Sequence, residues 1–361
     1  MLNVHIIVGA RPNLMKAAPI YKAFKSSGKI NPEVIDTGQH YDKNMSQVFF
    51  EEFGLPKPSH ELAVGSGSHA TQTAKIMTGY EQICLKKKPD WTIVVGDVNS
   101  TLACAITAAK LDIPVAHLEA GLRSRDLSMP EEVNRIVTDS ISTLLWTPSE
   151  DATENLLLEG HQQSAIDFVG NIMIDTLEAM KERFTNRAFW KQLDLEVGSY
   201  SLMTFHRPSN VDRPETVVQI ANEILEVSQK IPVVFPIHPR TRESMRNAGV
   251  LAKLENAKNV MLLEPLGYID FMSLLSNATF MISDSGGIQE ETSYLGVPCF
   301  TVRTTTERPI TLGMGSNSLI GISQISESAL VPMPERTAVK VPKFWDGHTA
   351  QRVTESLLRE S

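Results

Sequence analysis

Short apolar runs alternate with helix-patterned segments along almost the whole chain, and this alternation constrains the fold more than any other feature. Apolar runs of strand length, each followed by a helix, are typical of parallel sheets covered by helices on both faces. The sequence therefore predicts an α/β fold. In the first half we expect strands at 4–9, 33–37, 91–95, 114–119, 144–147 and 167–169, with helices at 13–25, 70–86 and 101–110.

A second series begins after a helix that we expect from 172 to about 184. Its expected strands are 201–205, 233–237, 260–263, 280–283 and 299–302. Because 361 residues are too many for one ordinary core, we predict two doubly wound, Rossmann-like domains. Their expected bounds are 1–170 and 171–348, and the final helix within 349–361 should pack back on the first domain. Ligands of such sheets bind beyond the carboxyl ends of the strands, so the cleft between the domains is the expected active site.

Composition narrows the class of protein. A hydrophobic content of 42% and a charged content of 21% are typical of a soluble globular protein, and no apolar run is long enough to span a bilayer. The start also lacks a signal-peptide pattern, so we expect a cytoplasmic protein with no membrane partner. A net charge of −8 argues against nucleic acid as a partner. The cysteines, Cys84, Cys104 and Cys299, have neither disulfide nor metal spacing, and we expect no metal and no cofactor.

A glycine turn follows the apolar run at 280–282. The residues Ser283-Asp284-Ser285-Gly286-Gly287 separate this run from a helical pattern, which predicts a strand, a tight turn and a helix. Two glycines allow an anion to approach the backbone closely, and helix N-terminal N–H groups attract phosphate. One turn later, Glu290 and Glu291 suit ribose hydroxyls. The alternative is an ordinary turn whose acidic residues favour the first turn of a helix.

Unusual polar clusters follow nearly every predicted strand. They occupy 9–16, 37–40, 96–100, 117–123, 206–210 and 238–240, in addition to the glycine turn. Because the carboxyl ends of parallel strands meet at one edge of a sheet, the clusters of each domain should lie together. Their common placement is hard to explain by solubility alone and predicts a functional site.

Two clusters of the first half each allow more than one interpretation. Arg11 and Lys16 follow the first strand, where cations would complement an anionic ligand but oppose the helix dipole, so a purely structural role is disfavoured. Asp97 follows the third of the six strands expected there, and it either caps the next helix or acts as a catalytic carboxylate.

The carboxylates that follow in the chain raise a similar choice. Glu119 follows a buried run, so it needs a cationic partner or a raised pKa, and Arg123 is the expected partner. Ser128 and Glu131 match a capping box, which competes with a catalytic role for Glu131. Arg135, one turn further on, can hold either Glu131 or Glu132.

The second half offers proton-handling and nucleotide-binding candidates. His206, after the first strand of this half, can carry protons or serve only as a hydrogen-bonding residue. His238 with Arg240 has the same ambiguity and ranks lower. The segment 303–309 is rich in hydroxyls and charge, and it either closes over a nucleotide or forms a solvated loop.

Taken together, these motifs resemble those of the non-hydrolysing UDP-N-acetylglucosamine 2-epimerases. The matching stretches are Gly-Ala-Arg-Pro at 9–12, Thr-Gly-Gln-His at 37–40, Gly-Asp at 96–97, His-Leu-Glu-Ala-Gly-Leu-Arg at 117–123, Pro-Glu-Glu-Val-Asn-Arg at 130–135, Gly-Asn at 170–171, Ser-Asp-Ser-Gly-Gly-Ile-Gln-Glu-Glu at 283–291 and Thr-Glu-Arg-Pro at 306–309. Each motif alone is weak. Their order and separations make the resemblance specific, and it covers almost the whole chain.

The resemblance implies a GT-B fold, a homodimer, and UDP bound mainly by the second domain. It also implies a role for each matched residue. The diphosphate would contact Ser285, Gly286 and Gly287. Glu291 would bind the ribose and Phe271 would lie near the uracil. Arg11 would lie by the nucleotide. The acid–base residues would be Asp97, Glu119, Glu131 and His206, with Lys16, Arg135 and Arg308 as supporting charges.

The implied reaction inverts C2 of a UDP-sugar. A base removes the C2 proton while UDP leaves C1 to give a 2-acetamidoglucal, and UDP then adds back as C2 is protonated on the opposite face. The chemistry needs positive charge for the departing diphosphate and at least two proton-handling groups, but neither metal nor redox cofactor. The product would supply surface polysaccharide synthesis.

Several positions depart from the family pattern. They are Ala10, Asn13, the run 98–100, the segment 311–317, Tyr41-Asp42 and Pro208-Ser209. The last two pairs replace residues that bind a second, activating substrate in many members, so allosteric activation stays open. So does the sugar, because relatives act on UDP-2,3-diacetamido-2,3-dideoxyglucuronate and others hydrolyse their product. Alternatives from other classes are a GT-B glycosyltransferase and a nucleotide-sugar sensor.

Overall fold

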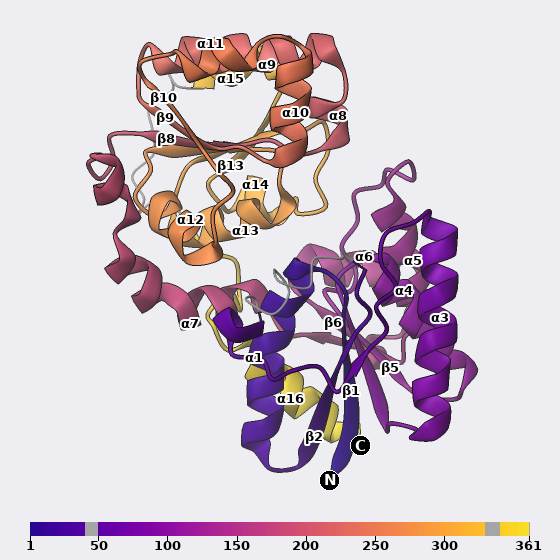
Figure 1. The fold of residues 1–361 in the computed structure, drawn as a ribbon. Helices are drawn as coiled ribbons and strands as arrows, with labels where there is room; N and C mark the ends of the chain where they lie inside the picture. The colour runs from indigo at the N-terminus through magenta and orange to yellow at the C-terminus, as the bar shows by residue number, and fades with distance from the viewer. Residues whose placement is uncertain (40–49, 329–339, 361) are drawn as a thin grey trace. The chain divides into compact units, whose positions relative to one another are not determined.

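The computed structural model describes residues 1–39, 50–328 and 340–360, so His40 and Tyr41-Asp42 of the sequence motifs lie outside it. The chain forms two compact units, the first made of Met1–Leu177 and Lys343–Ser361 and the second of Glu178–Pro342. Each unit is built on one sheet whose described strands pair in parallel (Figure 1). The predicted α/β class, with its doubly wound parallel sheets, is confirmed.

The first unit has the strand order β3-β2-β1-β4-β5-β6-β7. Its strands are β1 (Leu2–Val8), β2 (Ile30–Asp36), β3 (His60–Glu61), β4 (Trp91–Val95), β5 (Val115–Leu118), β6 (Leu144–Thr147) and β7 (Ile166–Phe168). Helices α1 (Arg11–Ser27) and α16 (Thr349–Arg359) cover one face, while α3 (His69–Lys86), α4 (Asn99–Lys110) and α5 (Pro130–Ile141) cover the other (Figure 1). The remaining elements are α6 (Glu150–Leu158), η1 (Gln163–Ala165) and α7 (Ile172–Arg187), which leads into the second unit.

Helix α16 is fixed to the first unit by specific bonds as well as by packing against α1. Asp175 accepts the backbone N–H groups of Thr349 (3.1 Å) and Ala350 (2.8 Å), which otherwise have no partner at the start of a helix. The indole of Trp146 in β6 donates to Ser356 Oγ at 2.7 Å. The chain therefore returns to the unit where it began.

The second unit has the order β10-β9-β8-β11-β12-β13. Its strands are β8 (Ser201–Thr204), β9 (Val233–Pro236), β10 (Val260–Leu263), β11 (Phe280–Ser283), β12 (Cys299–Val302) and β13 (Asn317–Ile320). One face carries α8 (Pro208–Val211), α9 (Pro214–Ser228), α10 (Pro239–Asn247), α11 (Leu251–Glu255) and α15 (Ile325–Ser328), and the other carries α12 (Tyr268–Leu275), α13 (Gly286–Leu295) and α14 (Ile310–Gly313) (Figure 1). Short η2 (Phe189–Leu193) and η3 (Ile322–Gln324) complete it.

Most predicted strands are found within a residue or two. Continuous apolar runs such as β4 and β6 are buried along their whole length, as expected for central parallel strands. Strands β3 and β13 were not predicted. Strand β3 has two exposed residues, and β13 is partly exposed and polar at its start, so neither has the apolar run that marks a strand in a sequence.

The strand order places a switch point in each sheet. In the first unit the chain winds outward from β1 in one direction and from β4 in the other, and in the second unit β8 and β11 play these parts. Loops diverge at such a point, and ligands of open α/β sheets bind there at the carboxyl ends of the strands. The residues that follow β1 and β4, and those that follow β8 and β11, are therefore the first candidates for a site.

Candidate active site

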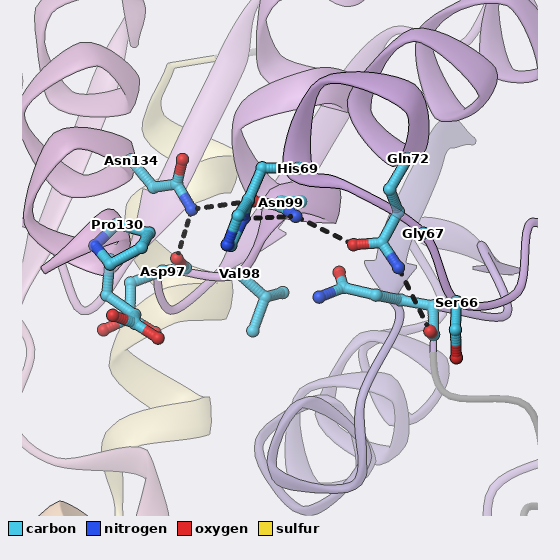
Figure 2. Close-up of a pocket in the computed structure, with 11 residues that line it drawn as sticks. Ser66, Gly67, His69, Gln72, Asp97, Val98, Asn99, Pro130 and Asn134 are labelled. Atoms are coloured by element: carbon cyan, nitrogen blue, oxygen red, sulfur yellow. Dashed lines mark hydrogen bonds between the residues drawn. The ribbon is translucent and has the colours of Figure 1, made fainter. Parts of the chain in front are cut away.

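The first unit holds a cavity of about 330 Å³ at the carboxyl ends of its strands (Figure 2). Two of the predicted catalytic residues, Asp97 after β4 and Glu131 in the first turn of α5, line it. The other lining residues are polar or small: Gln39, Ser66, Gly67, His69, Gln72, Val98, Asn99, Pro130 and Asn134. A cavity of this size fits one sugar ring better than a whole nucleotide sugar.

Glu119 has a cationic partner, but not the predicted one. Its carboxylate accepts from the ammonium of Lys16, a residue of α1, and both side chains are buried, with exposures of 4% and 10%. The expectation that Arg123 would hold Glu119 is wrong, because Arg123 pairs with Asp139 and Glu159 instead. Residues after β1 and β5 thus meet over β4, a contact that sequence distance cannot reveal.

Arg135 of α5 joins two carboxylates. It pairs with Asp97 and with Glu132, whose Oε2 lies 2.6 Å from Arg135 Nη2. Burial alone would raise the pKa of Glu132, but the backbone N–H of Ser124 and the guanidinium outweigh it and hold this pKa below its usual value. Asp97 keeps an exposure of 32%, so it combines a cationic partner with access to a ligand.

Neither capping interpretation is found. Val98, not Asp97, is the N-cap of α4, and Met129 is the N-cap of α5; neither N-cap forms a side-chain capping bond. Ser128 donates to Asp126 instead, because the chain enters α5 through Met129 and Pro130. Glu131 is exposed at the cavity, while its neighbour Glu132 forms the structural bonds.

A chain of amides continues the cavity wall away from Asp97, as Figure 2 shows. Asn134 Nδ2 donates to the Asp97 carbonyl at 2.8 Å, and Asn99 Nδ2 donates to Gln72 Oε1 at 2.8 Å. Asn99 also lies 3.1 Å from Nδ1 of His69. None of these side chains was predicted as a site residue. The departure at 98–100 was the available signal, since it places Asn99 on the wall.

The second unit has its own cluster, centred on Asp284 directly after β11. Its carboxylate lies 2.9 Å from Nδ1 of His206 and accepts the backbone N–H groups of His206 and Arg207 and the amide of Asn210. Burial alone would raise the pKa of Asp284, but the bond and charge of His206 outweigh it and keep this pKa below its usual value. The ionised carboxylate orients the imidazole so that Nε2 is the nitrogen for proton exchange.

These contacts span the switch point between β8 and β11. Asp284 was not assigned a role from the sequence, although its place between a buried strand and the glycine turn was a signal. His206 is 43% exposed, which suits a group that exchanges protons with a ligand. Nearby, burial and the proximity of His206 lower the pKa of His238, whose ring centre lies 6.0 Å from that of His206.

The glycine turn starts α13 as predicted, with Ser285 as N-cap in an extended conformation. A Cβ on Gly286 would lie 2.5 Å from Glu307 Oε1, so glycine is required there by close approach, whereas a Cβ on Gly287 would meet nothing within 4 Å. Arg303 and Arg308 hold the pKa of Glu307 well below its usual value, although burial opposes them. The Glu307 carboxylate and the Arg308 guanidinium therefore lie beside the start of α13, and Arg303 pairs with Glu307.

The segment 303–309 is not a solvated loop at its centre. Thr306, Glu307 and Arg308 are buried, and Arg308 pairs with Glu290 of α13 at 2.7 Å. Thr306 Oγ1 donates to Gln289 Oε1 at 2.7 Å. Among the predicted nucleotide contacts, Glu291 is buried in α13, Phe271 is half-buried in α12, and Arg11 is the first residue of α1 in the other unit.

The sequence model of UDP-N-acetylglucosamine 2-epimerases matches residues 22–358. The chain belongs to this family. It is 41% identical to UDP-N-acetylglucosamine 2-epimerase of Methanocaldococcus jannaschii, over 99% of both chains. It is 36% identical to UDP-2,3-diacetamido-2,3-dideoxy-D-glucuronate 2-epimerase of Pseudomonas aeruginosa, over 99% of this chain and 100% of the other.

Solved structures agree with this membership. The crystal structure of the M. jannaschii enzyme in complex with UDP-GlcNAc and UDP has a TM-score of 0.90 and 40% identity, covering 99% of this chain and 100% of that one. A lipopolysaccharide outer core galactosyltransferase, WaaB, has a TM-score of 0.53 at 12% identity over 100% of both chains, so it shares the fold alone. The predicted GT-B fold and the prediction of an isomerase acting on nucleotide sugars are confirmed.

Two further observations concern the described residues only. None of their helices combines the length and the apolar character that a membrane span needs. No group of three or more His, Cys, Asp or Glu side chains among them is placed to hold a metal ion.

Proposed function

We propose that the protein interconverts UDP-N-acetylglucosamine and UDP-N-acetylmannosamine without hydrolysis. The observation that carries the proposal is the gathering of Asp97, Glu119 and Glu131 at the carboxyl edge of one sheet, with cations beside two of them. Inversion of C2 needs proton-handling groups on both faces of the sugar, which one carboxylate can hardly supply.

In this proposal the residues of each unit have their own task. The diphosphate contacts Ser285 and binds the backbone N–H groups of Gly286 and Gly287, where the start of α13 favours negative charge. Arg308 supplies further positive charge, Glu291 binds the ribose and Phe271 lies by the uracil. The sugar enters the cavity of the first unit, beside which Lys16 pairs with Glu119 and Arg135 pairs with Asp97. Arg11 lies by the nucleotide.

The charges of the cavity favour a neutral sugar over a uronate. Asp97 and Glu131 are the acidic side chains among the described residues that line it, and those residues include no lysine or arginine. A sugar carboxylate placed there would face like charges without a direct cationic partner. The amides of Gln39, Gln72 and Asn99 instead suit hydroxyl and acetamido groups. This contrast favours UDP-N-acetylglucosamine over the diacetamido uronate.

The chemistry follows from these placements. A carboxylate of the first unit takes the proton from C2, the C2–H electrons form the C1=C2 bond, and the C1–O bond breaks to release UDP. The turn before α13 stabilises the charge of the departing diphosphate. UDP then attacks C1 of the 2-acetamidoglucal, and an acid delivers a proton to the other face of C2. His206, oriented by Asp284, exchanges protons on the leaving-group side.

The test is NMR of the enzyme with UDP-N-acetylglucosamine in D₂O. We expect UDP-N-acetylmannosamine to form. At equilibrium both it and the remaining UDP-N-acetylglucosamine should carry deuterium at C2. Free N-acetylmannosamine with UDP would contradict the non-hydrolysing reaction. Turnover of the diacetamido uronate, but not of UDP-N-acetylglucosamine, would overturn the sugar assignment.

The alternatives differ in what they require. A GT-B glycosyltransferase would need an acceptor and leave the donor alone unchanged, and the galactosyltransferase likeness supports only the shared fold. A nucleotide-sugar sensor would bind UDP-sugar with no exchange at C2. The same NMR experiment separates both from an epimerase.

We also propose that the protein works as a cytoplasmic homodimer that supplies activated aminosugar to polysaccharide synthesis. The family resemblance supports the dimer, the location and the pathway. The buried free thiols of the protein, Cys84, Cys104 and Cys299, fit a reducing compartment. Light scattering coupled to size-exclusion chromatography tests the dimer, since a mass near one chain of 39.9 kDa would contradict it.

A further inference from the structure

A buried group of charges, here called the Asp139 network, lies beneath the first-unit carboxylates. It consists of His117 in β5, Arg123 and Asp139 of α5. Asp139 Oδ1 lies 2.6 Å from His117 Nδ1, and its Oδ2 lies 2.7 Å from Arg123 Nη2. The side chains of His117 and Asp139 have no exposed surface, and that of Arg123 is 2% exposed. Side chains this deeply buried do not touch a ligand, so their use must be indirect.

Both ring nitrogens of His117 face acceptor oxygens. Its Nε2 lies 2.8 Å from the carbonyl oxygen of Gly96, which only accepts, so Nε2 carries a proton. Its Nδ1 faces Asp139. Burial alone would raise the pKa of Asp139, but His117 and Arg123 outweigh it and hold this pKa below its usual value. A charged carboxylate also only accepts, so the ring of His117 lies between two acceptors and connects Asp139 to the Gly96 carbonyl.

The network reaches the two turns that carry Asp97 and Glu119. Gly96, whose carbonyl oxygen accepts a hydrogen bond from His117 Nε2, immediately precedes Asp97 and has a φ of +68°. The backbone N–H of Gly121, two residues after Glu119, donates to Asp139 Oδ2 at 3.1 Å. Glu119 itself has a φ of +70°, which a side chain rarely adopts and which its surroundings must therefore impose.

The same two turns meet above the network. A Cβ on Gly96 would lie 3.4 Å from Lys16 Nζ and 3.6 Å from Glu119 Oε2, so the Lys16–Glu119 pair rests on the Gly96 turn. A shift of that turn would move Asp97 directly and the pair by contact. Both turns are linked to Asp139: the Gly96 turn through His117, and the turn after Glu119 through the backbone N–H of Gly121.

We propose that Asp139 is a positioning residue for the epimerisation, which holds Asp97 through His117 and Gly96 and holds Glu119 through Gly121. The inference rests on the proposed roles of Asp97 and Glu119. It predicts a loss in kcat that exceeds any loss of folded protein, since a misplacement of about 1 Å can cost on the order of 100-fold in rate. Binding of UDP, assigned to the second unit, should be unaffected.

The decisive variants are Asp139→Asn, His117→Gln and His117→Leu. Asp139→Asn places an amide N–H against a donor, and we expect kcat per folded molecule to fall by about 10- to 100-fold, with KM and the Kd of UDP within about twofold. His117→Gln keeps a donor that can reach the Gly96 carbonyl, whereas His117→Leu has none. The Gln variant should therefore retain clearly more kcat than the Leu variant.

Asp175→Asn is the matched control. Asp175 is buried in the same unit and accepts two backbone N–H groups, those of Thr349 and Ala350, so its loss should lower Tm with kcat per folded molecule unchanged. Equal kcat in His117→Gln and His117→Leu, or wild-type kcat per folded molecule in Asp139→Asn, would overturn the positioning role alone. Wild-type kcat in both Asp97→Asn and Glu119→Gln would overturn the proposed function and this inference with it.

Discussion

The two units place different chemistry at the same point of the same fold. In the first, the switch point between β1 and β4 gathers carboxylates with cations: Lys16 beside Glu119, and Arg135 beside Asp97. In the second, the switch point between β8 and β11 pairs one histidine with a buried aspartate and opens into the start of α13. The comparison teaches that the fold sets where a site lies, while the residues after the strands set what it does.

In the proposed function the first unit carries out proton transfer at C2, whereas the second unit binds the diphosphate and its His206 exchanges a proton with the leaving group. A variant of one unit that impairs the task of the other would contradict this division of tasks.

Glu119→Gln should have the largest effect. The amide keeps the shape but cannot take a proton, so kcat should fall by about 10²- to 10⁴-fold. Isothermal titration with UDP should give a Kd within about twofold of wild type. Glu33→Gln is the control, because Glu33 pairs with the exposed Lys87 in the same unit and should change neither value. Lost UDP affinity in Glu119→Gln would contradict the division of tasks.

Glu131→Gln and Glu132→Gln test neighbouring carboxylates with opposite roles. Glu131 faces the cavity, so its variant should lose about 100-fold in kcat with Tm unchanged. Glu132 accepts the N–H groups of Ser124 and Arg125 and pairs with Arg135, so its variant should lose about 1–3 kcal/mol of stability. Steady-state kinetics and thermal unfolding of the two variants check this. A loss of stability in Glu131→Gln with a loss of kcat in Glu132→Gln would show that Glu132 is the catalytic carboxylate and Glu131 the structural one.

Gly286→Ala and Gly287→Ala compare two adjacent glycines at the anion site. A Cβ at Gly286 would displace the Glu307 carboxylate, whereas one at Gly287 meets open space. Overpacking of this kind costs about 1–3 kcal/mol. Because the displaced carboxylate lies at the anion site, we expect a cost of this size on binding, which is a loss of UDP affinity of about 5- to 150-fold in Gly286→Ala. Gly287→Ala should lose less than Gly286→Ala. Isothermal titration checks this, and deuterium exchange at C2 under saturating substrate should stay near wild type.

Between about pH 6.5 and 4, acid should weaken the first unit more than the second, because His5 is buried whereas His238, whose pKa is also lowered, is exposed. Burial lowers the pKa of His5 in β1 to about 4, so between about pH 6.5 and 4 the unfolded chain binds a proton that the folded unit excludes. Stability of this unit is therefore lost as pH falls through that window, by on the order of 3 kcal/mol. The lowered pKa of Asp284 removes stability from the second unit only below about pH 4.

Hydrogen exchange measured by mass spectrometry between pH 6.5 and 4 resolves the two units. Peptides of β1 and β4 should lose protection before those of β8 and β11. His5→Gln should flatten the slope in the first unit, since glutamine does not titrate. An unchanged slope would remove His5 as the cause.

Much of the fold could be predicted from the sequence because central parallel strands are continuous apolar runs. Runs such as 91–95 and 280–283 were located to the residue. The exposed β3 and β13 carry no such signal. The site was harder, because partners depend on which strands are neighbours. Lys16 meets Glu119 and His206 meets Asp284 only after the sheet order brings the loops together.

Local motifs were also ambiguous where the path of the chain into a helix decides which side chains form the cap. Ser128 and Glu131 have the spacing of a capping box, yet Ser128 bonds Asp126 and Glu131 reaches the cavity. The roles of the predicted nucleotide contacts, Phe271 and Glu291 among them, stay predictions.

A crystal structure of Glu119→Gln with UDP-N-acetylglucosamine is the most direct test of the division between the units. We predict that the diphosphate oxygens accept hydrogen bonds from the backbone N–H groups at Gly286 and Gly287. The sugar ring should lie in the cavity lined by Asp97 and Glu131, with C2 near residue 119. A diphosphate bound by Lys16 or Arg135, away from the start of α13, would contradict the account.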